Sequence, residues 1–411
     1  MGAVARTIER RRQVAVATDV SSAAAGDPAG RVASWVRAAA HRDRAWARRV
    51  FGLWGAGLTA TLLIGFAGRN SQAARSAVFP LATVAVLALG LLALGRYVRV
   101  GPIAYRRIAL TTVFLLGFII VTGSLVRLTG SGLGCTDWPT CNGGAIVPAS
   151  GSHAWIEFGN RLVTDFCVLA AAIAALAALV RVPYRRDLPR LGGVLIVAIM
   201  GNAVLGGAVV LTGLKPAIVM GHFLLAVGAL AVGVQILNRS SEPGRSATLL
   251  GRERTPVLAP RGLIVQRALT ISALATIVLG TVVTGSGPHG GDPGKVDRFG
   301  FVMRDVARLH SLAAWCTVAA TVVLAVMSAR APGKAAARLR GRLGVLLGVL
   351  VAQGVVGYVQ WFAAVPAPLV QVHVLGAVLM WIAVLRVRAA GTVAAGATAR
   401  HGQPNRTVSL A

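Results

Sequence analysis

The chain has 411 residues, of which 55% are hydrophobic and only 13% are charged, and its net charge is +29. A soluble domain carries about 25% charged residues, so this composition excludes a water-soluble enzyme and a disordered chain. It indicates a helical membrane protein instead. Four cysteines in a chain of this length also exclude a disulfide-based scaffold.

The chain begins with an Arg-rich polar segment, residues 1–49, which we expect to be a basic cytoplasmic tail. An amphipathic helix on the inner leaflet is one interpretation of this segment, and a disordered tail is the alternative. No cleavable signal peptide is predicted, because the first apolar run begins only at Val50. Residues 50–104 contain two apolar runs, Val50–Gly68 and Ser76–Gly95, and predict two extra transmembrane helices.

Eight further apolar runs are long enough to cross a bilayer, for which about 20 residues suffice. The longest run is interrupted by Pro366 and Pro368, so we divide it into two helices. The predicted spans are Ile108–Val126, Glu157–Val180, Leu191–Leu214, Pro216–Asn238, Ala268–Gly291, Leu309–Ala329 and the two halves of Leu343–Leu385.

Basic residues occupy alternate loops between these spans. Arg181–Arg190 and Arg330–Arg342 each hold four arginines, and Arg239–Arg267 holds six, whereas Leu128–Ile156 holds no basic residue other than His153. The positive-inside rule therefore predicts that both termini are cytoplasmic and that the Leu128–Ile156 loop is outside the cell membrane. A nucleic-acid partner is not expected, because the arginines lie in short loops between spans.

The eight spans also form two copies of four. Thr129-Gly-Ser-Gly recurs 155 residues later at Thr284, and His222 corresponds to His373 at an offset of 151. Asn160 falls opposite His310 at an offset of 150. Since each copy has an even number of spans, the two copies share one orientation. We therefore predict an all-α polytopic membrane protein with an eight-helix core of two pseudo-symmetric four-helix bundles, in addition to the two extra N-terminal transmembrane helices. The predicted divisions are 105–240 and 263–388 for the bundles, 241–262 for a cytoplasmic linker and 389–411 for a cytoplasmic tail.

Three histidines, His222, His310 and His373, lie a few residues into spans that descend from the outer face, roughly 5–10 Å below it. Intramembrane ionisable residues are costly and indicate function. Two imidazoles that face each other across a bundle suit axial ligation of a haem iron, so we predict that His310 and His373 bind haem. The alternative is that each ring only bonds a carbonyl of a neighbouring helix. His289, in a Gly-rich loop, is expected to be solvated.

The first bundle is less symmetric, because Asn160 stands where the repeat predicts a histidine. His153, Glu157 and Arg161 lie nearby on one face of the predicted helix. Glu157 could act as a general base or stabilise a cation; the alternative is a salt bridge with Arg161, one turn away. Arg127, Arg161 and Arg308 lie near the outer ends of their spans. They could pair with haem propionates, or they could be ordinary interfacial arginines.

Cys135 and Cys141 lie in the predicted outer loop, where a disulfide is the expected state. It could pin a lid over the Glu157 site or exchange electrons with a partner. Cys167 and Cys316 fall inside spans and are expected to be buried packing residues.

The stretch from Val121 through the Cys135-Thr-Asp-Trp-Pro-Thr-Cys141-Asn-Gly loop resembles the first loop of the haem A synthase family, which works beside cytochrome oxidase assembly. The resemblance extends from about Tyr105 to Leu385, because the Glu157-x-x-x-Arg161 segment and the three membrane histidines also fall where that family has them.

This resemblance implies that His310 and His373 hold haem B, and that the substrate haem O binds in the N-terminal half with His222 as an iron ligand. It implies that Glu157 is the catalytic carboxylate in the oxidation of a haem O methyl group to a formyl group, through successive hydroxylations with oxygen from water, to give haem A. Implied partners are haem O synthase as donor, membrane lipid, cytochrome oxidase assembly factors and an electron acceptor; homo-oligomerisation is left open.

Two features depart from the family pattern. Asn160 replaces a usual histidine, so the ligand opposite His222 is left open between His153, water and none. The two extra N-terminal spans are absent from the family's usual eight-helix core. Two other functional classes also use such folds: a diheme electron-transfer protein, which would not need Glu157, and a transporter, which would need polar residues near the midplane.

Overall fold

The structure is a computed structural model that describes residues 99–240, 254–294 and 296–394. The predicted basic tail and both predicted N-terminal spans lie outside the described residues. The same is true of most of the predicted linker and of the C-terminal tail beyond residue 394. The predictions made for these segments therefore stay predictions.

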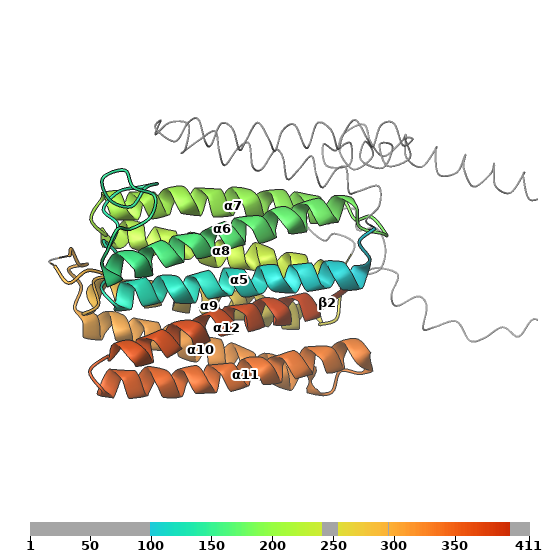
Figure 1. Ribbon diagram of the computed structural model, residues 1–411. Helices are drawn as coiled ribbons and strands as arrows, with labels where there is room; N and C mark the ends of the chain where they lie inside the picture. Colours follow the sequence, from blue (N-terminus) through green and yellow to red (C-terminus); the bar gives the residue numbers. More distant parts are fainter. Residues whose placement is uncertain (1–98, 241–253, 295, 395–411) are drawn as a thin grey trace, which may run out of the picture.

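Eight long helices form nearly all of the described chain (Figure 1). Each is long and apolar enough to cross a membrane, so the predicted all-α polytopic membrane fold is confirmed. The helices are α5 (Pro102–Leu128), α6 (Ser152–Leu179), α7 (Asp187–Leu211), α8 (Pro216–Ser240), α9 (Pro260–Ser286), α10 (Met303–Ala329), α11 (Gly333–Phe362) and α12 (Ala367–Ala390). Two short strands, β1 (Arg254–Pro256) and β2 (Thr392–Ala394), pair antiparallel.

Several helices begin earlier than the apolar runs suggested. The helix predicted from Ala268 begins at Pro260, and the one predicted from Leu343 begins at Gly333. Both extensions contain arginine, which is a good helix former and whose long stem lies along apolar surface while its charge reaches water. A charged residue therefore ends an apolar run without ending the helix.

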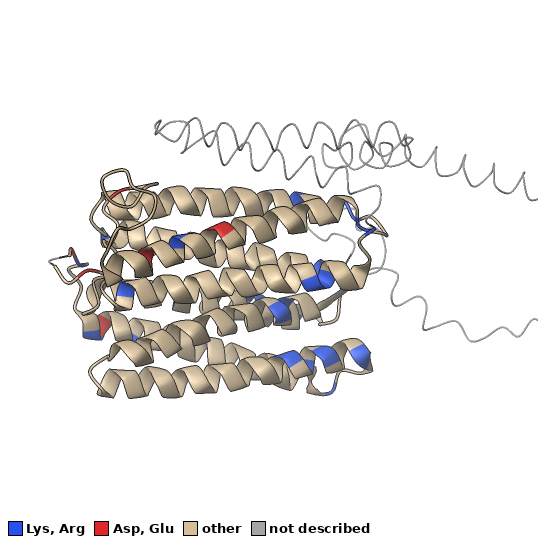
Figure 2. Cartoon of the chain, viewed as in Figure 1, with Lys and Arg blue, Asp and Glu red and all other residues tan. Residues whose placement is uncertain are grey.

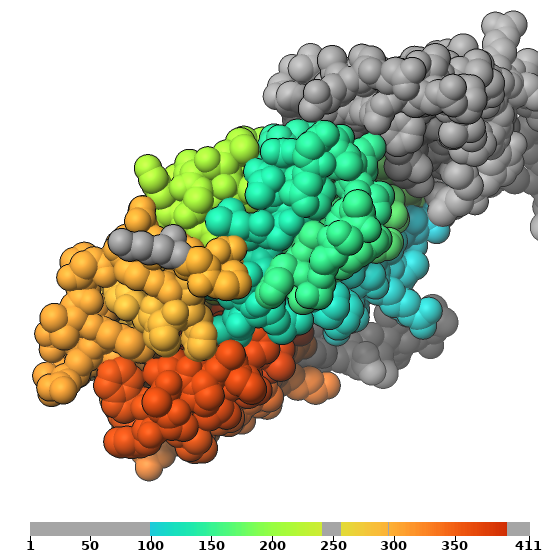
Figure 3. Space-filling model, turned by 60° about the vertical axis from the view of Figure 1, so that its left-hand side comes forward, coloured from blue at the N-terminus to red at the C-terminus, as the bar shows by residue number. Residues whose placement is uncertain are grey.

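The helices are arranged in two rings of four. In the first ring, α5 and α7 each pack against both α6 and α8; in the second, α9 and α11 each lie between α10 and α12. The two bundles lie side by side, with α5 and α8 of the first against α12 and α9 of the second (Figures 1 and 3). This is the architecture that the internal repeat predicted.

Polar contacts join the bundles. The indole Nε1 of Trp381 donates to the carbonyl of Val227 (3.2 Å). The side-chain amide of Gln371 donates to the carbonyl of Val121 (2.9 Å) and accepts from the Ser124 hydroxyl (2.8 Å). Because few competing donors exist in an apolar interior, these bonds fix how the bundles are packed.

Most lysines and arginines of the described chain lie at one end of the helices, opposite the Cys135–Cys141 loop (Figure 2). We call these the basic end and the disulfide end. At the basic end Asp187 is fully buried and pairs with Arg185 (2.8 Å) and Arg239 (2.9 Å). Such pairing compensates for the cost of removing the charges from water.

Candidate functional site

One large cavity extends into both bundles of the described chain. Its volume is about 1780 Å³, well above the roughly 300–1000 Å³ of a usual small-molecule pocket. Its lining comes from all eight described helices and from the loops at the disulfide end. Three membrane histidines named from the sequence, together with Asn160 and Glu157, line this one space.

In the second bundle, His310 of α10 and His373 of α12 face each other. Their ring centroids lie 6.1 Å apart and the ring planes cross at 70°. A metal ion bound by one nitrogen of each ring at about 2 Å would separate the centroids by about 6 Å. His310 Nδ1 bonds the carbonyl oxygen of Thr276 (2.9 Å), so its Nε2 is the nitrogen left for a ligand. The donor set therefore fits axial ligation of one iron.

Each of these rings lies against a glycine of a neighbouring helix. A Cβ built on Gly280 would lie 3.1 Å from Cε1 of His310, and one on Gly357 would lie 3.4 Å from Cε1 of His373. The first bundle repeats this arrangement, since a Cβ on Gly206 would lie 2.9 Å from Cε1 of His222. A side chain at Gly206 or Gly280 would have to displace the ring, so these two glycines help to set the ring positions, whereas a Cβ at Gly357 would make an ordinary contact with His373.

In the first bundle, His222 of α8 is held in the same way as His310. Its Nδ1 bonds the carbonyl oxygen of Asn202 (3.1 Å), which leaves Nε2 for the cavity. Asn160 of α6 occupies the place that His310 has in the second bundle. The Oδ1 of Asn160 accepts a hydrogen bond from the hydroxyl of Thr122 (2.8 Å).

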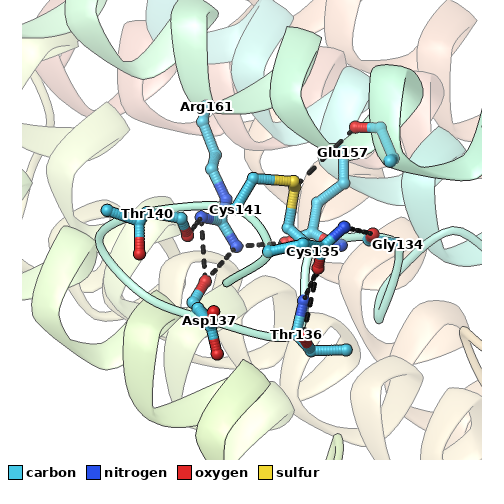
Figure 4. The surroundings of a disulfide bond; sticks show 10 residues. Gly134, Cys135, Thr136, Asp137, Thr140, Cys141, Glu157 and Arg161 are labelled. Atoms are coloured by element: carbon cyan, nitrogen blue, oxygen red, sulfur yellow. Dashed lines mark hydrogen bonds and ion pairs between the residues drawn. A yellow bond between two sulfur atoms is a disulfide. The ribbon is translucent and has the colours of Figure 1, made fainter. Parts of the chain in front are cut away.

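Glu157 is buried beneath the disulfide loop, yet its side chain also lines the cavity. Its Oε2 accepts from the backbone N–H of Cys135 (2.7 Å), and its Oε1 pairs with Arg161 (2.5 Å). Arg161 in turn donates to the carbonyls of Asp137 (3.1 Å) and Thr140 (2.8 Å), as Figure 4 shows. The salt bridge that the spacing suggested as the alternative to catalysis is therefore present, and it orients the carboxylate toward the loop.

Cys135 and Cys141 form the predicted disulfide, with their Cα atoms 4.4 Å apart and both residues buried. The bridge closes the loop directly over Glu157 (Figure 4). Of the other two cysteines, Cys167 is buried as expected. The expectation was wrong for Cys316 of α10, which is exposed.

The remaining predicted site residues are distributed unequally around the cavity. His153 is exposed, its Nδ1 bonds the Ser131 hydroxyl (2.9 Å), and it is not among the lining residues. Arg127 lines the cavity and donates to the carbonyls of His289 (2.9 Å) and Thr284 (3.0 Å). Arg308 also lines the cavity. It is exposed, and it forms a long ion pair with Asp305 (3.6 Å).

His289 is not the solvated loop residue that the sequence suggested. It is half-buried and lines the cavity, and its Nε2 bonds the carbonyl oxygen of Val365 (2.9 Å). The Gly-rich loop folds inward because its carbonyls accept from Arg127 and Arg298. Nothing in the local sequence indicates this contact.

Asp165 is a cavity residue that the sequence reasoning missed. It lies 13 residues into α6, about 20 Å along the helix, and its side chain is exposed to the cavity. It has no hydrogen bond or ion pair to any residue within the described ranges. The signal was available, because a carboxylate deep in an apolar span is costly and indicates function.

Comparison with known proteins gives a consistent result. Residues 106–288 match a family model described as "Cytochrome oxidase assembly protein". The Heme A synthase of Alkalihalophilus pseudofirmus is 30% identical over 132 residues, which are 32% of this chain and 44% of that protein. The Heme A synthase of Bacillus licheniformis is 31% identical over 121 residues, which are 29% of this chain and 40% of that protein. The Heme A synthase of Bacillus pumilus is 30% identical over 149 residues, which are 36% of this chain and 48% of that protein.

The resemblance to the haem A synthase family is confirmed. The matched stretch spans less than half the length of each of these relatives. The family match covers the first bundle and α9, which include Glu157, His222 and the disulfide loop. The His310–His373 pair lies beyond the matched residues and depends on its own geometry.

Proposed function

We propose that this protein is a haem A synthase, which oxidises a methyl group of haem O to a formyl group and so supplies haem A for cytochrome oxidase. The observation that carries the proposal is the single cavity. It contains the facing His310–His373 pair together with His222 and Glu157.

In this proposal His310 and His373 hold haem B as axial ligands, and His222 binds the iron of the substrate haem O. The 6.1 Å separation of the two rings supports the first assignment. The volume of the cavity supports two large ligands rather than one. Three arginines line the cavity and would pair with propionates: Arg127, Arg161 and Arg308. Arg308 has the weakest interaction with the protein, since its ion pair with Asp305 is long and exposed.

Glu157 is the proposed catalytic carboxylate. Its contacts with Arg161 and the Cys135 N–H fix its orientation. From that position its negative charge would stabilise positive charge that develops on the substrate as electrons leave the methyl group, and it would accept a proton from the attacking water.

Each hydroxylation removes two electrons and two protons and adds the oxygen of one water. After the second, the geminal diol loses water to leave the formyl group. Haem B, when bound, supplies one-electron redox chemistry between the substrate and an external electron acceptor. The apolar walls of the cavity would limit access of bulk water, so that the water molecule near Glu157 is the one that reacts.

The proposed location is the cell membrane, with the disulfide end outside and both termini in the cytoplasm. The concentration of arginines at the basic end supports this orientation, and a disulfide is stable outside the cytoplasm. Proposed partners are haem O synthase as donor of the substrate, membrane lipid, cytochrome oxidase assembly factors and the electron acceptor.

The test is expression of the full chain in a host that makes haem O but lacks its own haem A synthase, followed by extraction and mass identification of the pigments. We expect haem A in cells that carry the chain and none in cells that carry Glu157→Gln. Two equivalents of haem B without haem O or haem A would instead support a diheme electron-transfer protein and overturn the proposal.

A further inference from the structure

The first bundle departs from the second at one position, Asn160. The repeat pairs Asn160 with His310 and His222 with His373. The helix neighbours agree, because a Cβ on Gly123 of α5 would be in ordinary contact with the Asn160 amide (3.9 Å), and His310 likewise packs against α9 at Gly280. Asn160 therefore stands on the side of the first bundle that faces His222 across the site.

The amide of Asn160 has a defined orientation. Its Oδ1 accepts the hydroxyl proton of Thr122 at 2.8 Å, and no bond to its Nδ2 is present within the described part of the chain. An amide nitrogen has no lone pair available for a metal, but it carries two N–H donors. The group that Asn160 can offer to the cavity is thus a hydrogen-bond donor and not an iron ligand.

Three nearby side chains with coordinating atoms do not take the missing position. A fourth, Asp165, lies five residues further along α6, about 7.5 Å deeper than Asn160. His153 is exposed, bonded to Ser131 and outside the cavity lining. The carboxylate of Glu157 is held toward the disulfide loop by the Cys135 N–H and by Arg161. The Cys167 thiol is buried against the Leu115 carbonyl (3.4 Å) on the side of α5.

Resting on the proposed function, we propose that the substrate haem iron has His222 as its one protein ligand, and that Asn160 Nδ2 donates a hydrogen bond to a small exogenous ligand on the opposite face. The chemical class of that ligand is water, hydroxide or a small anion such as azide. Such a face, with a donor but no coordinating side chain, is the arrangement in which haem proteins bind and exchange small molecules. The two haem sites would then differ in spin state.

The test uses the full chain, purified in its ferric form and supplied with excess haem O, and reads the iron by electron paramagnetic resonance and optical spectroscopy. We expect two haems per chain, one low-spin and one high-spin, and we expect azide to convert only the high-spin haem to low-spin. Two low-spin haems, or a single low-spin haem after supply of haem O, would overturn the inference.

Three variants sharpen this test. Asn160→His should restore a second histidine pair, remove the high-spin signal and abolish azide binding. Asn160→Ala should keep the high-spin signal and weaken azide binding about tenfold, the usual effect of losing one hydrogen bond to a charged group. His153→Ala is the matched control and should change neither reading; if it shifts the spin state, His153 is the ligand and the inference is wrong.

The outcome is separable from that of the proposed function. A high-spin, azide-binding haem in a chain that yields no haem A would leave the inference standing and refute the synthase assignment. Normal haem A production by a chain with two low-spin haems would support the synthase assignment and refute the inference.

Discussion

The imidazole rings of His310 and His373 lie 6.1 Å apart across the second bundle, although 63 residues separate them in the chain. In the first bundle the equivalent residues are Asn160 and His222, so the duplicated frame is retained while one of four ligand positions has changed. The frame itself is set by helix packing and by the glycines against the rings. The two bundles can therefore hold similar groups and differ in chemistry.

We expect His310→Ala and His373→Ala each to lose haem from the second bundle, because each variant keeps only one of the two coordinate bonds to the iron. The measurement is haem B per chain, from pigment extraction, with the Soret band as a second reading. His289→Ala is the matched control, since His289 also lines the cavity but its Nε2, the nitrogen that His310 leaves for a ligand, bonds the carbonyl oxygen of Val365. Unchanged haem content in both variants would contradict the assignment of the pair.

Gly206→Ala should disturb the substrate side alone. The added methyl would lie 2.9 Å from Cε1 of His222, closer than a normal contact, so the ring must move. We expect haem O binding to weaken several-fold while haem B content stays normal. Gly193→Ala lies on the same helix, where a Cβ would meet nothing within 4 Å. That control should bind haem O normally and gain roughly 0.5–1 kcal/mol of helix stability. Equal haem O affinities in the two variants would exclude a role for this glycine.

Glu157→Gln retains a side chain of the same shape, and its remaining oxygen can accept from the Cys135 N–H. The ion pair with Arg161 is lost in a largely buried setting, which costs roughly 1–3 kcal/mol, while Arg161 keeps its bonds to the carbonyls of Asp137 and Thr140. We therefore expect a folded chain with normal haem B that forms no formyl product, measured by mass analysis of extracted haems. Haem A at the wild-type level would show that Glu157 serves only the loop.

The double variant Cys135→Ser, Cys141→Ser lacks the disulfide that closes this short loop. In the chain-entropy model, the disulfide contributes roughly 2 kcal/mol to the free energy of unfolding. Because the bridged loop covers Glu157 and not the second bundle, thermal unfolding should shift to lower temperature while haem B content stays unchanged. Parallel melting curves and haem assays check this. Loss of haem B would mean that the loop also supports the second bundle.

The sequence predicted those parts of the site that depend on helix periodicity and on the internal repeat. The histidine pair was predictable, because depth along a helix and the repeat fix the positions of His310 and His373. The Glu157–Arg161 bridge was predictable from helical spacing. The inward fold of the His289 loop was not, since it depends on Arg127, 162 residues away in the chain. Hydrogen bonds between loops and helices of different bundles leave no periodic signal.

Asp165 provides the last prediction. Gly192 of α7 lies against Ala175 of α6, where a Cβ would come within 2.7 Å of the Ala175 Cα. Counting ten residues along each antiparallel helix from this contact places Asp165 and Asn202 at one depth. The Asn202 Oδ1 is buried with no partner in the described part of the chain. Two polar groups without protein partners in the described part of the chain thus share one level of the cavity.

Asp165→Leu should therefore stabilise the empty protein by about 1–3 kcal/mol, because it removes a carboxylate from the membrane-embedded part of α6. If the carboxylate serves a ligand, the same variant should lose affinity for haem O while haem B stays bound. Thermal unfolding of the ligand-free chain and haem O titration measure the two effects separately. Phe166→Leu, an exposed neighbour on the same helix, is the control and should change neither. A destabilised Asp165→Leu would instead mean that Asp165 has a structural partner.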